Sequence, residues 1–487
     1  MDQHQTPLLD ALAAIEHRPL HGFGAPAHHQ GAAIPPGLTA LLGKRLFRAD
    51  VITPKGLDDR TESAHALQRA HEIAAEAWGA EFCRFATGGS TQSLHVALAA
   101  VAAPGDTVVF AANVHKAERA HALVAGLNAA CVPAIVDPAW DVEHGVDPAA
   151  LAATLDAHPG ARAVVIVSPS YYGVTSDVAA LAGLCHARDI PLICDAAWGG
   201  AFAFCDALPD DPLAQGADMA VYSVHKTMGA LTQGSALLAR GNLIDQQRLW
   251  MAYELFETTS PSVPILASLD AARRQHALTG ASMWNHALRR AALLRELLAE
   301  IPGLRVFGTG DLPAGAALDQ TKVLIDTSAL GVSAYALDDW LSEHHRVSAG
   351  LSTARHLLAV LSPGTGKRDV RALARGLADA VDRLAKGTIA LAPLGSVPTL
   401  DTLSIEMAAN PAAAFFGAVE QVSFEAAAGR IAAEVIAPAP PGVPRLVPGQ
   451  LISPAHVAWL IAQRDHGMFL LDPVDPAERT LRVMRTG

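Results

Sequence analysis

Hydrophobic and polar positions follow two different periods along this chain. The segment ESAHALQRAHEIAAEAWG, from Glu62 to Gly79, has apolar residues at helical spacing and predicts a helix that ends at the glycine. Short apolar runs typical of strands follow at DTVVFAA (106–112), AVVIVSP (163–169), PLICDAAW (191–198) and DMAVYSV (218–224). Helical spacing returns between them, in PAALAATLDAH (148–158) and DVAALAGLCHARD (177–189). This alternation predicts an α/β fold with a mostly parallel sheet, flanking helices and right-handed crossovers.

The two ends of the chain have different patterns. An amphipathic segment, Pro7 to Ile15, leads into HGFGAPAHHQGAAIPPG (21–37), whose glycines and prolines predict a loop. Later, NHALRRAALLRELLAEI (285–301) predicts a helix, and TKVLIDTSAL (321–330) and HHRVSAGLST (344–353) predict strands of a smaller region. We expect an arm over 1–60, a large domain over 61–285, a smaller α/β region over 286–410, and an α+β C-terminal domain over 411–487. The Pro-rich stretch Ala437 to Gln450 is expected to separate the last helices and turns from the smaller region.

Composition excludes several classes of protein. The 487 residues are 51% hydrophobic and 17% charged, which suits a compact enzyme of two or three domains. The formal charge of −12 argues against a nucleic-acid partner. Five scattered cysteines without a C-x-x-C pair argue against disulfides and zinc, and the histidines of the N-terminal loop have no further ligand at metal spacing. The acidic start and the lack of a long apolar run predict a cytoplasmic protein without a membrane segment.

The most informative stretch is VYSVHKTMGALTQGS, from Val221 to Ser235. It places Lys226 directly after one predicted strand, while Asp195 ends the strand before it. A lysine that holds an aldehyde as a Schiff base and a carboxylate that keeps a pyridine nitrogen protonated are what pyridoxal 5′-phosphate (PLP) needs. Ligands of such sheets bind beyond the carboxyl ends of the strands, where the turn SPSYYG (Ser168 to Gly173) is also expected.

Two further stretches suit a phosphorylated, flat cofactor. In FATGGSTQS, expected between the end of one helix and the helical run SLHVALAAVAA (93–103), two glycines permit a tight turn, and Ser90 and Thr91 stand at a helix start. Free N–H groups and a positive dipole there attract phosphate, although a plain capped helix is the alternative. In NVHKAE, His115 is placed either to stack on a ring or simply to end a strand.

In order along the chain, these motifs resemble those of the ornithine/lysine/arginine decarboxylases of PLP fold type I, which are related to the aspartate aminotransferase fold. The resemblance covers nearly the whole length. It runs through GLDD (Gly56 to Asp59), GGST, NVHK, SPSYYGV, DAAWGG, SVHKTMGALTQGS, TTSPSVPILASLDAAR and GRIAAEVIAPAPPGVPRLVPG.

The resemblance implies a role for each matching residue. Lys226 would carry the Schiff base, Asp195 would face the pyridine nitrogen, and His115 would stack on the ring. The phosphate would be held by Ser90, Thr91, Ser223 and His225, with further cofactor contacts from Gly89, Ala197 and Trp198. Ser260 would approach the phosphate from a neighbouring subunit, because the family builds its sites across the interface of a homodimer.

The substrate segments depart from the family pattern. The N-terminal FGAPAHH keeps His28 of the family motif, and Tyr171 lies in the SPSYYG turn. Ala439 replaces an aromatic residue, Gln450 replaces an acid, and Arg445 stands where apolar residues are usual. Because cationic substrates are met by acids and aromatic rings, we expect a preference for something other than unmodified lysine or ornithine.

The resemblance implies a decarboxylase of amino-acid metabolism and polyamine biosynthesis, which releases CO₂ and an amine. One alternative is a PLP enzyme of the same fold that carries out transamination, elimination or oxidative deamination of another amino acid. Another is a catalytically idle member that binds a partner, against which the retained Lys226, Asp195 and His115 argue.

Overall fold

The computed structural model of the chain describes residues 1–17, 23–51, 65–438, 442–468, 470 and 473–485. The GLDD motif and Ala439 therefore lie outside the described residues. The chain divides into two compact units, and each is considered by itself: unit 1 comprises Met1–Val101, Cys185–Asp206 and Asp210–Ser282, and unit 2 comprises Ala102–Leu184, Ala207–Pro209 and Met283–Gly487. Within the described ranges, no helix has both the length and the apolar character that a membrane crossing requires.

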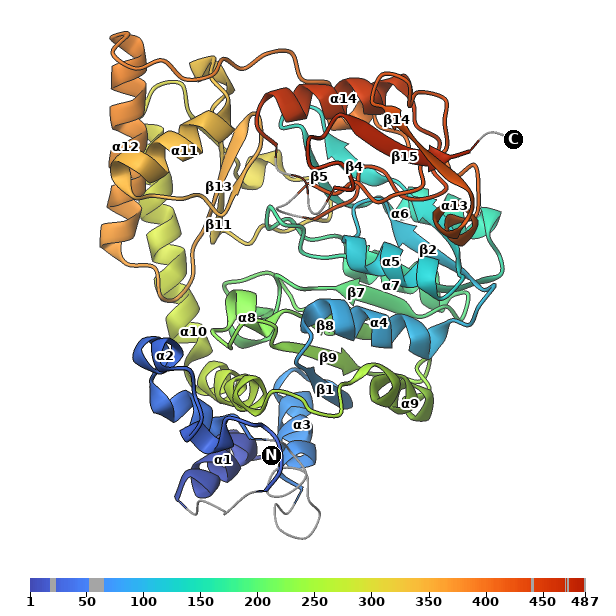
Figure 1. Cartoon of the computed structure of the whole chain (residues 1–487), viewed down its shortest axis with the longest axis vertical. Helices are drawn as coiled ribbons and strands as arrows, with labels where there is room; N and C mark the ends of the chain where they lie inside the picture. Colours follow the sequence, from blue (N-terminus) through green and yellow to red (C-terminus); the bar gives the residue numbers. More distant parts are fainter. Residues whose placement is uncertain (18–22, 52–64, 439–441, 469, 471–472, 486–487) are drawn as a thin grey trace. The chain divides into compact units, whose positions relative to one another are not determined.

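The strands of unit 1 pair in the order β1-β9-β8-β7 (Figure 1). Their bounds are β1 Phe82–Ala86, β7 Leu192–Asp195, β8 Met219–Tyr222 and β9 Ser235–Ala239. Strands β7 and β8 are parallel, and β9 runs antiparallel to both β8 and β1. All positions of β7 and β8 are buried, which explains why they read as continuous apolar runs. Strand β1 was not predicted, and it precedes the glycine turn where we expected the end of a helix.

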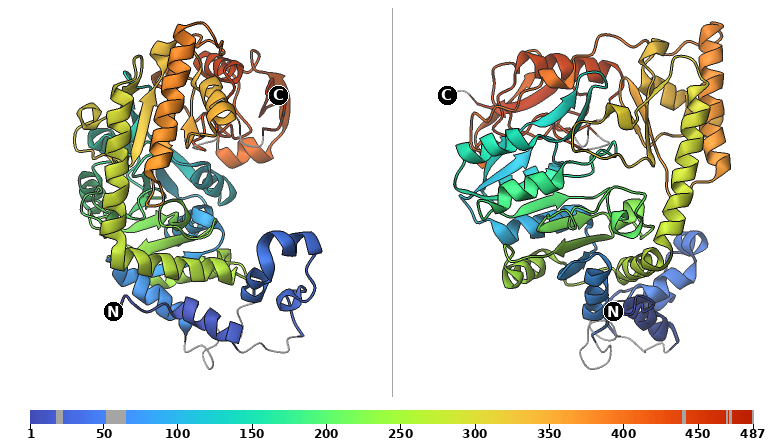
Figure 2. Two further views of the ribbon diagram at one scale, coloured as in Figure 1. Left: turned by 90° about the vertical axis from the view of Figure 1, so that its left-hand side faces the viewer. Right: turned by 180° about the vertical axis from the view of Figure 1, so that it is seen from behind.

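Seven α-helices within the described residues lie wholly or mainly in unit 1. They are α1 Pro7–His17, α2 Pro36–Ala49, α3 Ala66–Ala77, α4 Gly89–Val101, α8 Val224–Thr227, α9 Gln246–Phe256 and the start of α10 Val263–Ala299. Asp270 and Arg273 form a buried ion pair on α10. Asp270 accepts from the backbone N–H of Leu8, and Arg273 donates to the carbonyls of Gln3 and Gln5. The ion pair thus anchors the N-terminal segment of the chain. Helix α2 was not predicted; it projects away from the sheet (Figure 2).

In unit 2, strands β6, β2 and β3 lie side by side and run parallel, as predicted for the DTVVFAA and AVVIVSP segments. A short antiparallel hairpin, β4–β5, follows β3. The elements of this part are β2 Thr107–Ala111, α5 Lys116–Val124, β3 Asn128–Val132, β4 Ala134–Asp137, β5 Val142–Val146, α6 Pro148–Ala157, β6 Ala161–Val167 and α7 Val178–His186. Helix α6 begins at Pro148, and Asp147 caps it by accepting from the N–H of Ala149.

A second sheet of unit 2 is antiparallel, in the order β10-β11-β13-β12. It comprises β10 Arg305–Val306, β11 Lys322–Asp326, β12 Leu351–Ser352 and β13 His356–Val360, and it packs against α10, α11 Ala334–His345 and α12 Lys367–Ala385. The strand predicted over 344–353 was wrong in extent. Helix α11 continues to His345, Arg346 ends it in the left-handed region (φ 54°), and only two residues of the segment form β12. The longer strand lies further on, at β13.

The C-terminal part of unit 2 is a small α+β region, as predicted. Strands β14 Val419–Ser423 and β15 Thr480–Met484 pair antiparallel, and α13 Pro411–Phe416 and α14 Pro454–Asp465 accompany them. Its core contains Phe424, Ile436, Leu446, Leu460 and Val483. Ile436, directly before the Pro-rich stretch, and Leu446, within it, thus belong to a packed core.

Candidate active site

Asp195 and Lys226 follow neighbouring parallel strands of unit 1. Asp195 is the last residue of β7 and pairs opposite Val221 of β8, and Lys226 lies in the short helix α8 that begins directly after β8. Asp195 is 5% exposed, and its Oδ1 accepts a hydrogen bond from the N–H of Ala197 at 3.0 Å. The backbone therefore fixes one carboxylate oxygen at the carboxyl end of the strand, which is the predicted placement.

Trp198 lies next to the lysine. The Nζ atom of Lys226 is 4.9 Å from the centroid of the Trp198 ring. The turn that carries the tryptophan is closed by a hydrogen bond from the N–H of Gly199 to the carbonyl of Ala196, at 2.8 Å. A Cβ atom added to Gly200 would lie 3.2 Å from Met228 Sδ and 3.2 Å from Thr227 Oγ1. The turn therefore packs directly against the end of α8.

The residues predicted to hold a phosphate come together at the start of α4. Ser90 Oγ is 2.6 Å from Ser223 Oγ, so the first turn of α4 meets the N-cap of α8. Thr91, in the same turn, is exposed. The N–H of Gly89 donates to the carbonyl of Gln233 at 2.8 Å, in the loop that leads into β9. A pair of hydroxyls beside a helix N-terminus suits an anion.

His225 is the fourth residue predicted to hold the phosphate. Its Nδ1 lies 2.9 Å from the carbonyl oxygen of Gly234, and the two backbones are joined by a bond from the N–H of His225 to the same carbonyl at 3.2 Å. Burial lowers the pKa of His225, and the nearby Lys226 charge lowers it further. A neutral imidazole that donates from Nδ1 to the carbonyl is therefore favoured.

In unit 2, His115 is fixed on two sides. Its Nδ1 accepts from the N–H of Ala117 at 3.2 Å, so His115 caps helix α5. The N–H of Lys116 donates to the carbonyl of Gly442 at 3.0 Å. A Cβ atom added to Gly442 would lie 2.7 Å from Nε2 of the histidine. The glycine of the PAPPG segment thus permits a close approach to the ring of His115, a contact that the sequence analysis did not identify.

Replacing Gly442 by alanine should displace His115 and reduce activity. Gly442 has a φ of +85°, so alanine is strained there, and its Cβ would also overlap the imidazole. Gly429→Ala is the matched control, because Gly429 has a φ of +79° and open space around a Cβ. We expect kcat/KM to fall at least about tenfold, roughly 1.4 kcal/mol, for Gly442→Ala alone. Equal losses in both variants would mean that only backbone strain matters.

Two of the predicted substrate residues have structural partners in unit 2. Arg445 Nη1 lies 2.8 Å from a carboxylate oxygen of Glu143, with 11% and 12% of the two side chains exposed. Gln450 is buried; its Oε1 accepts from Val447 N, and its Nε2 donates to the carbonyl of Ser404 and lies 3.2 Å from Nε2 of His456. The charge of Arg445 is therefore matched locally. No signal in the sequence pointed to Glu143, which is 302 positions away.

Tyr171 and His28, the other two predicted substrate residues, also have defined contacts. Tyr171 donates its hydroxyl to the carbonyl of Gly350 at 3.0 Å, and burial raises its pKa to about 12. In the arm of unit 1, His28 Nε2 is 3.2 Å from a carboxylate oxygen of Asp50, and its ring meets Phe47 edge-on. Ser260 follows α9 in an exposed turn, where its N–H donates to Thr258 Oγ1.

Comparison with known proteins identifies the family. Residues 6–313 match the model of the Orn/Lys/Arg decarboxylase major domain, and residues 399–466 match the model of its C-terminal domain. The chain belongs to the Orn/Lys/Arg decarboxylase family. The predicted resemblance is thus confirmed, and the protein is an amino-acid decarboxylase, a lyase. Transamination, elimination and oxidative deamination are not favoured.

Relatives match over nearly the whole length. An arginine decarboxylase of Halalkalibacterium halodurans is 33% identical over 487 residues, which cover 99% of this chain and 98% of that protein. An arginine decarboxylase of Bacillus subtilis is 30% identical over 495 residues, covering 100% and 99%. The constitutive lysine decarboxylase of Escherichia coli is 25% identical and covers 93% of this chain and 76% of that protein.

Solved structures confirm the predicted fold. The lysine decarboxylase of Francisella novicida superposes with a TM-score of 0.82 at 18% identity, covering 99% of this chain and 81% of that one. An alanine–glyoxylate aminotransferase of Nostoc sp. superposes with a TM-score of 0.53 at 16% identity, covering 65% and 86%. The fold is therefore that of the decarboxylases related to the aminotransferases, PLP fold type I.

Proposed function

We propose that this protein decarboxylates L-arginine with PLP bound at Lys226, releasing CO₂ and agmatine. The observation that carries the proposal is the placement of Lys226 and Asp195 after adjacent parallel strands, with Trp198 beside the lysine. A primary amine and a buried carboxylate in this arrangement match the two ends of a pyridine aldehyde. Family membership supports the same cofactor.

The surrounding residues of unit 1 fit the rest of this cofactor. Ser90 and Ser223 bring two hydroxyls within 2.6 Å of each other at the first turn of α4, which suits a phosphate. Asp195 accepts from the N–H of Ala197 through Oδ1, and its Oδ2 could receive a pyridinium N–H. In unit 2, His115 presents a ring that is held by Ala117 and Gly442.

Each residue then has a defined task. When bound, PLP supplies an electron sink for the bond to the departing carboxylate. Asp195 would keep a proton on the ring nitrogen by accepting its N–H in a buried site. Lys226 would hold the cofactor covalently through its Nζ amine. Ser90, Ser223 and the start of α4 hold the phosphate, so that the reacting bond keeps one orientation.

Arginine is favoured among the basic amino acids for two reasons. The relatives that match 98% or more of their own length at 30–33% identity are arginine decarboxylases. Arg445 and Gln450 make internal contacts with Glu143 and His456, so neither departure by itself argues for an acidic substrate. We still expect the enzyme to discriminate against lysine and ornithine.

We expect kcat/KM for L-arginine to exceed that for lysine and ornithine by at least about a hundredfold, because a site that hydrogen-bonds a guanidinium leaves buried polar groups unpaired when the substrate lacks one. Initial rates of CO₂ release from the three amino acids measure this ratio. Assays for ammonia and for keto acid accompany them and test whether another bond is broken. Efficient turnover of lysine with none of arginine would contradict the proposal.

A homodimer is the second part of the proposal. Helix α9 of unit 1 exposes large apolar side chains, including Met251 at 63% and Leu255 at 76%, next to the turn that carries Ser260. Exposed apolar side chains gathered on one helix favour a protein partner, and a twofold pair of identical chains is the commonest closed assembly. The implied approach of Ser260 to a neighbouring site fits this arrangement.

Sedimentation equilibrium should show a dimer as the smallest active species. Leu255→Glu is expected to shift the protein to monomers and to lower activity in parallel, because it places a charge within the apolar face of α9. Val124→Glu is the matched control, since Val124 is 77% exposed on α5. A fully active monomer at the assay concentration would exclude the dimeric site.

A further inference from the structure

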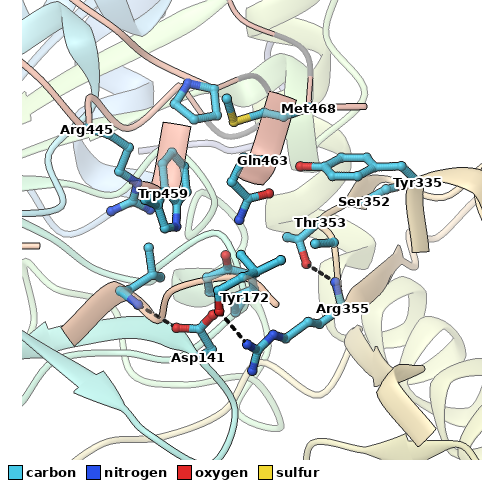
Figure 3. Close-up of a pocket in the computed structure, with 14 residues that line it drawn as sticks. Asp141, Tyr172, Tyr335, Ser352, Thr353, Arg355, Arg445, Trp459, Gln463 and Met468 are labelled. Carbon is cyan, nitrogen blue, oxygen red and sulfur yellow. Dashed lines mark hydrogen bonds between the residues drawn. The ribbon is translucent and has the colours of Figure 1, made fainter. Parts of the chain in front are cut away.

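Unit 2 contains a cavity of about 50 Å³ beside helix α14, lined by both polar and apolar side chains (Figure 3). Trp459 and Gln463 of α14 point into it, and Asp141, from the turn of the β4–β5 hairpin, faces them. Arg355, directly before β13, and Arg445 complete the charged part of the lining. At roughly 10–15 Å³ per water, the volume corresponds to a few water-sized positions, enough for a carboxylate group.

Each of the two α14 side chains has one buried polar atom that lacks a hydrogen-bond partner among the described residues. Trp459 is 4% exposed and Gln463 is 7% exposed, and they lie four residues apart on one face of the helix. Neither the indole Nε1 of Trp459 nor Oε1 of Gln463 has a hydrogen-bond partner among the described residues. Because buried polar groups are nearly always paired, two that face one cavity indicate an occupant.

Each of the two arginines also has an Nε–H donor without an acceptor among the described residues. Arg355 donates Nη2 to the carbonyl of Val397 at 2.9 Å, and its Nε is buried and unpaired within the described residues. Across the same described ranges, no carboxylate lies within ion-pair distance of Arg355. Arg445 pairs with Glu143, its Nε is likewise unpaired, and its guanidinium lies 5.8 Å from the Trp459 ring.

Asp141, the acid of the cavity, forms no ion pair with Arg355 or Arg445 within the described residues. Asp141 uses Oδ1 to accept from the N–H of Leu400 at 2.7 Å. Burial raises the pKa of Asp141, and the charges of Arg355 and Arg445 oppose that rise. Among the residues that the structure describes, Arg355 Nε, Arg445 Nε and Trp459 Nε1 are therefore N–H donors without an acceptor.

We propose that this cavity binds the carboxylate group of a small organic acid. Two oxygens of one carboxylate can accept from Arg355 Nε and Trp459 Nε1 together, whereas a cation or a purely donating group would leave both unpaired. The amide of Gln463 adds a polar contact of either sense, since its oxygen and nitrogen can exchange places.

The carboxylate has two possible sources. One source is the amino-acid substrate, which rests on the proposed function. The carbonyl of Pro438, in the lining, accepts from the N–H of Gly442, and Gly442 packs against His115, so the cavity is connected to a predicted active-site residue. The other is a separate organic acid that binds as an effector. Both require the same donors, so the site is tested first and its occupant second.

The site is tested by titrating the holoenzyme with ¹³C-labelled acetate and following its NMR line broadening. We expect Arg355→Gln to weaken acetate binding at least about tenfold. Trp459→Phe, which keeps the ring and loses only the N–H, should weaken it by about threefold or more. Arg162→Gln, an exposed arginine elsewhere in unit 2, is the control and should bind as the wild type does. Acetate binding that is absent, or unchanged in both cavity variants, would overturn the proposal.

Competition identifies the occupant. L-arginine and agmatine, which lacks the carboxylate, are added to acetate-loaded holoenzyme whose turnover has been stopped by borohydride reduction. Displacement by arginine and not by agmatine assigns the cavity to the substrate carboxylate, and displacement by neither assigns it to a separate acid. Displacement by both would show that the carboxylate is not what is recognised and would reject the site. If the cavity binds acetate but the protein releases no CO₂ from arginine, the proposed function is refuted and the carboxylate site is not.

Discussion

Lys226→Ala is expected to abolish both turnover and the visible absorption of the purified protein. The lysine lies in α8, directly after β8, and its Nζ is 4.9 Å from the Trp198 ring, so it is the amine that meets a cofactor at this strand end. Without it the aldehyde has no covalent anchor and the substrate amine has no group to displace. We expect a loss of several orders of magnitude in kcat.

Absorption spectra and CO₂ release, measured on the same preparations, check this result. Lys367→Ala is the matched control, because Lys367 is exposed at the start of α12. Circular dichroism should show native folding for both variants. An alanine variant that kept the absorption band and the activity would place the covalent link on another residue.

Asp195→Asn is expected to preserve the fold and to lower kcat by several orders of magnitude. Asparagine keeps an oxygen that can accept from the N–H of Ala197, so the end of β7 should be unchanged. It loses the negative charge, however, and a neutral pyridine is a poor electron sink. The residue is 5% exposed, so solvent cannot replace the missing charge.

Steady-state rates with L-arginine measure this effect, and Asp206→Asn, at an exposed position of the same unit, is the control. The absorption band should persist in Asp195→Asn, which separates loss of chemistry from loss of cofactor. A decrease of less than about tenfold, roughly 1.4 kcal/mol of barrier, would mean that Asp195 does not face the ring nitrogen.

The local periodicities of the chain predicted strands β7 and β8 and the start of helix α4, but not β1, β9 or the short helix α8. Asp195 and Lys226 could be placed together because consecutive apolar runs separated by one connection form neighbouring parallel strands, and their carboxyl ends meet at one edge. The start of α4 at the GGST turn could be predicted for the same reason, since glycines and hydroxyl residues mark a helix start within a few positions.

The predictions failed where a segment is decided by distant packing. The HHRVSAGLST segment has strand-like residues, yet α11 buries Leu337 and Leu341 against the second sheet and so continues as a helix to His345. Strand β1 was overlooked because it is held by antiparallel pairing with β9, about 150 positions later. Such pairings leave no periodic signal in a short window.

The sequence by itself therefore determined the fold class, the order of the strands that carry Asp195 and Lys226, and the family, because each depends on local pattern or on ordered motifs. Only the tertiary structure decided the environments of Arg445 and His115. The ion pair with Glu143 and the approach of Gly442 to the imidazole join residues about 300 positions apart. Chain folding brings such residues within bonding distance, and short-range spacing carries no information about which of them will meet.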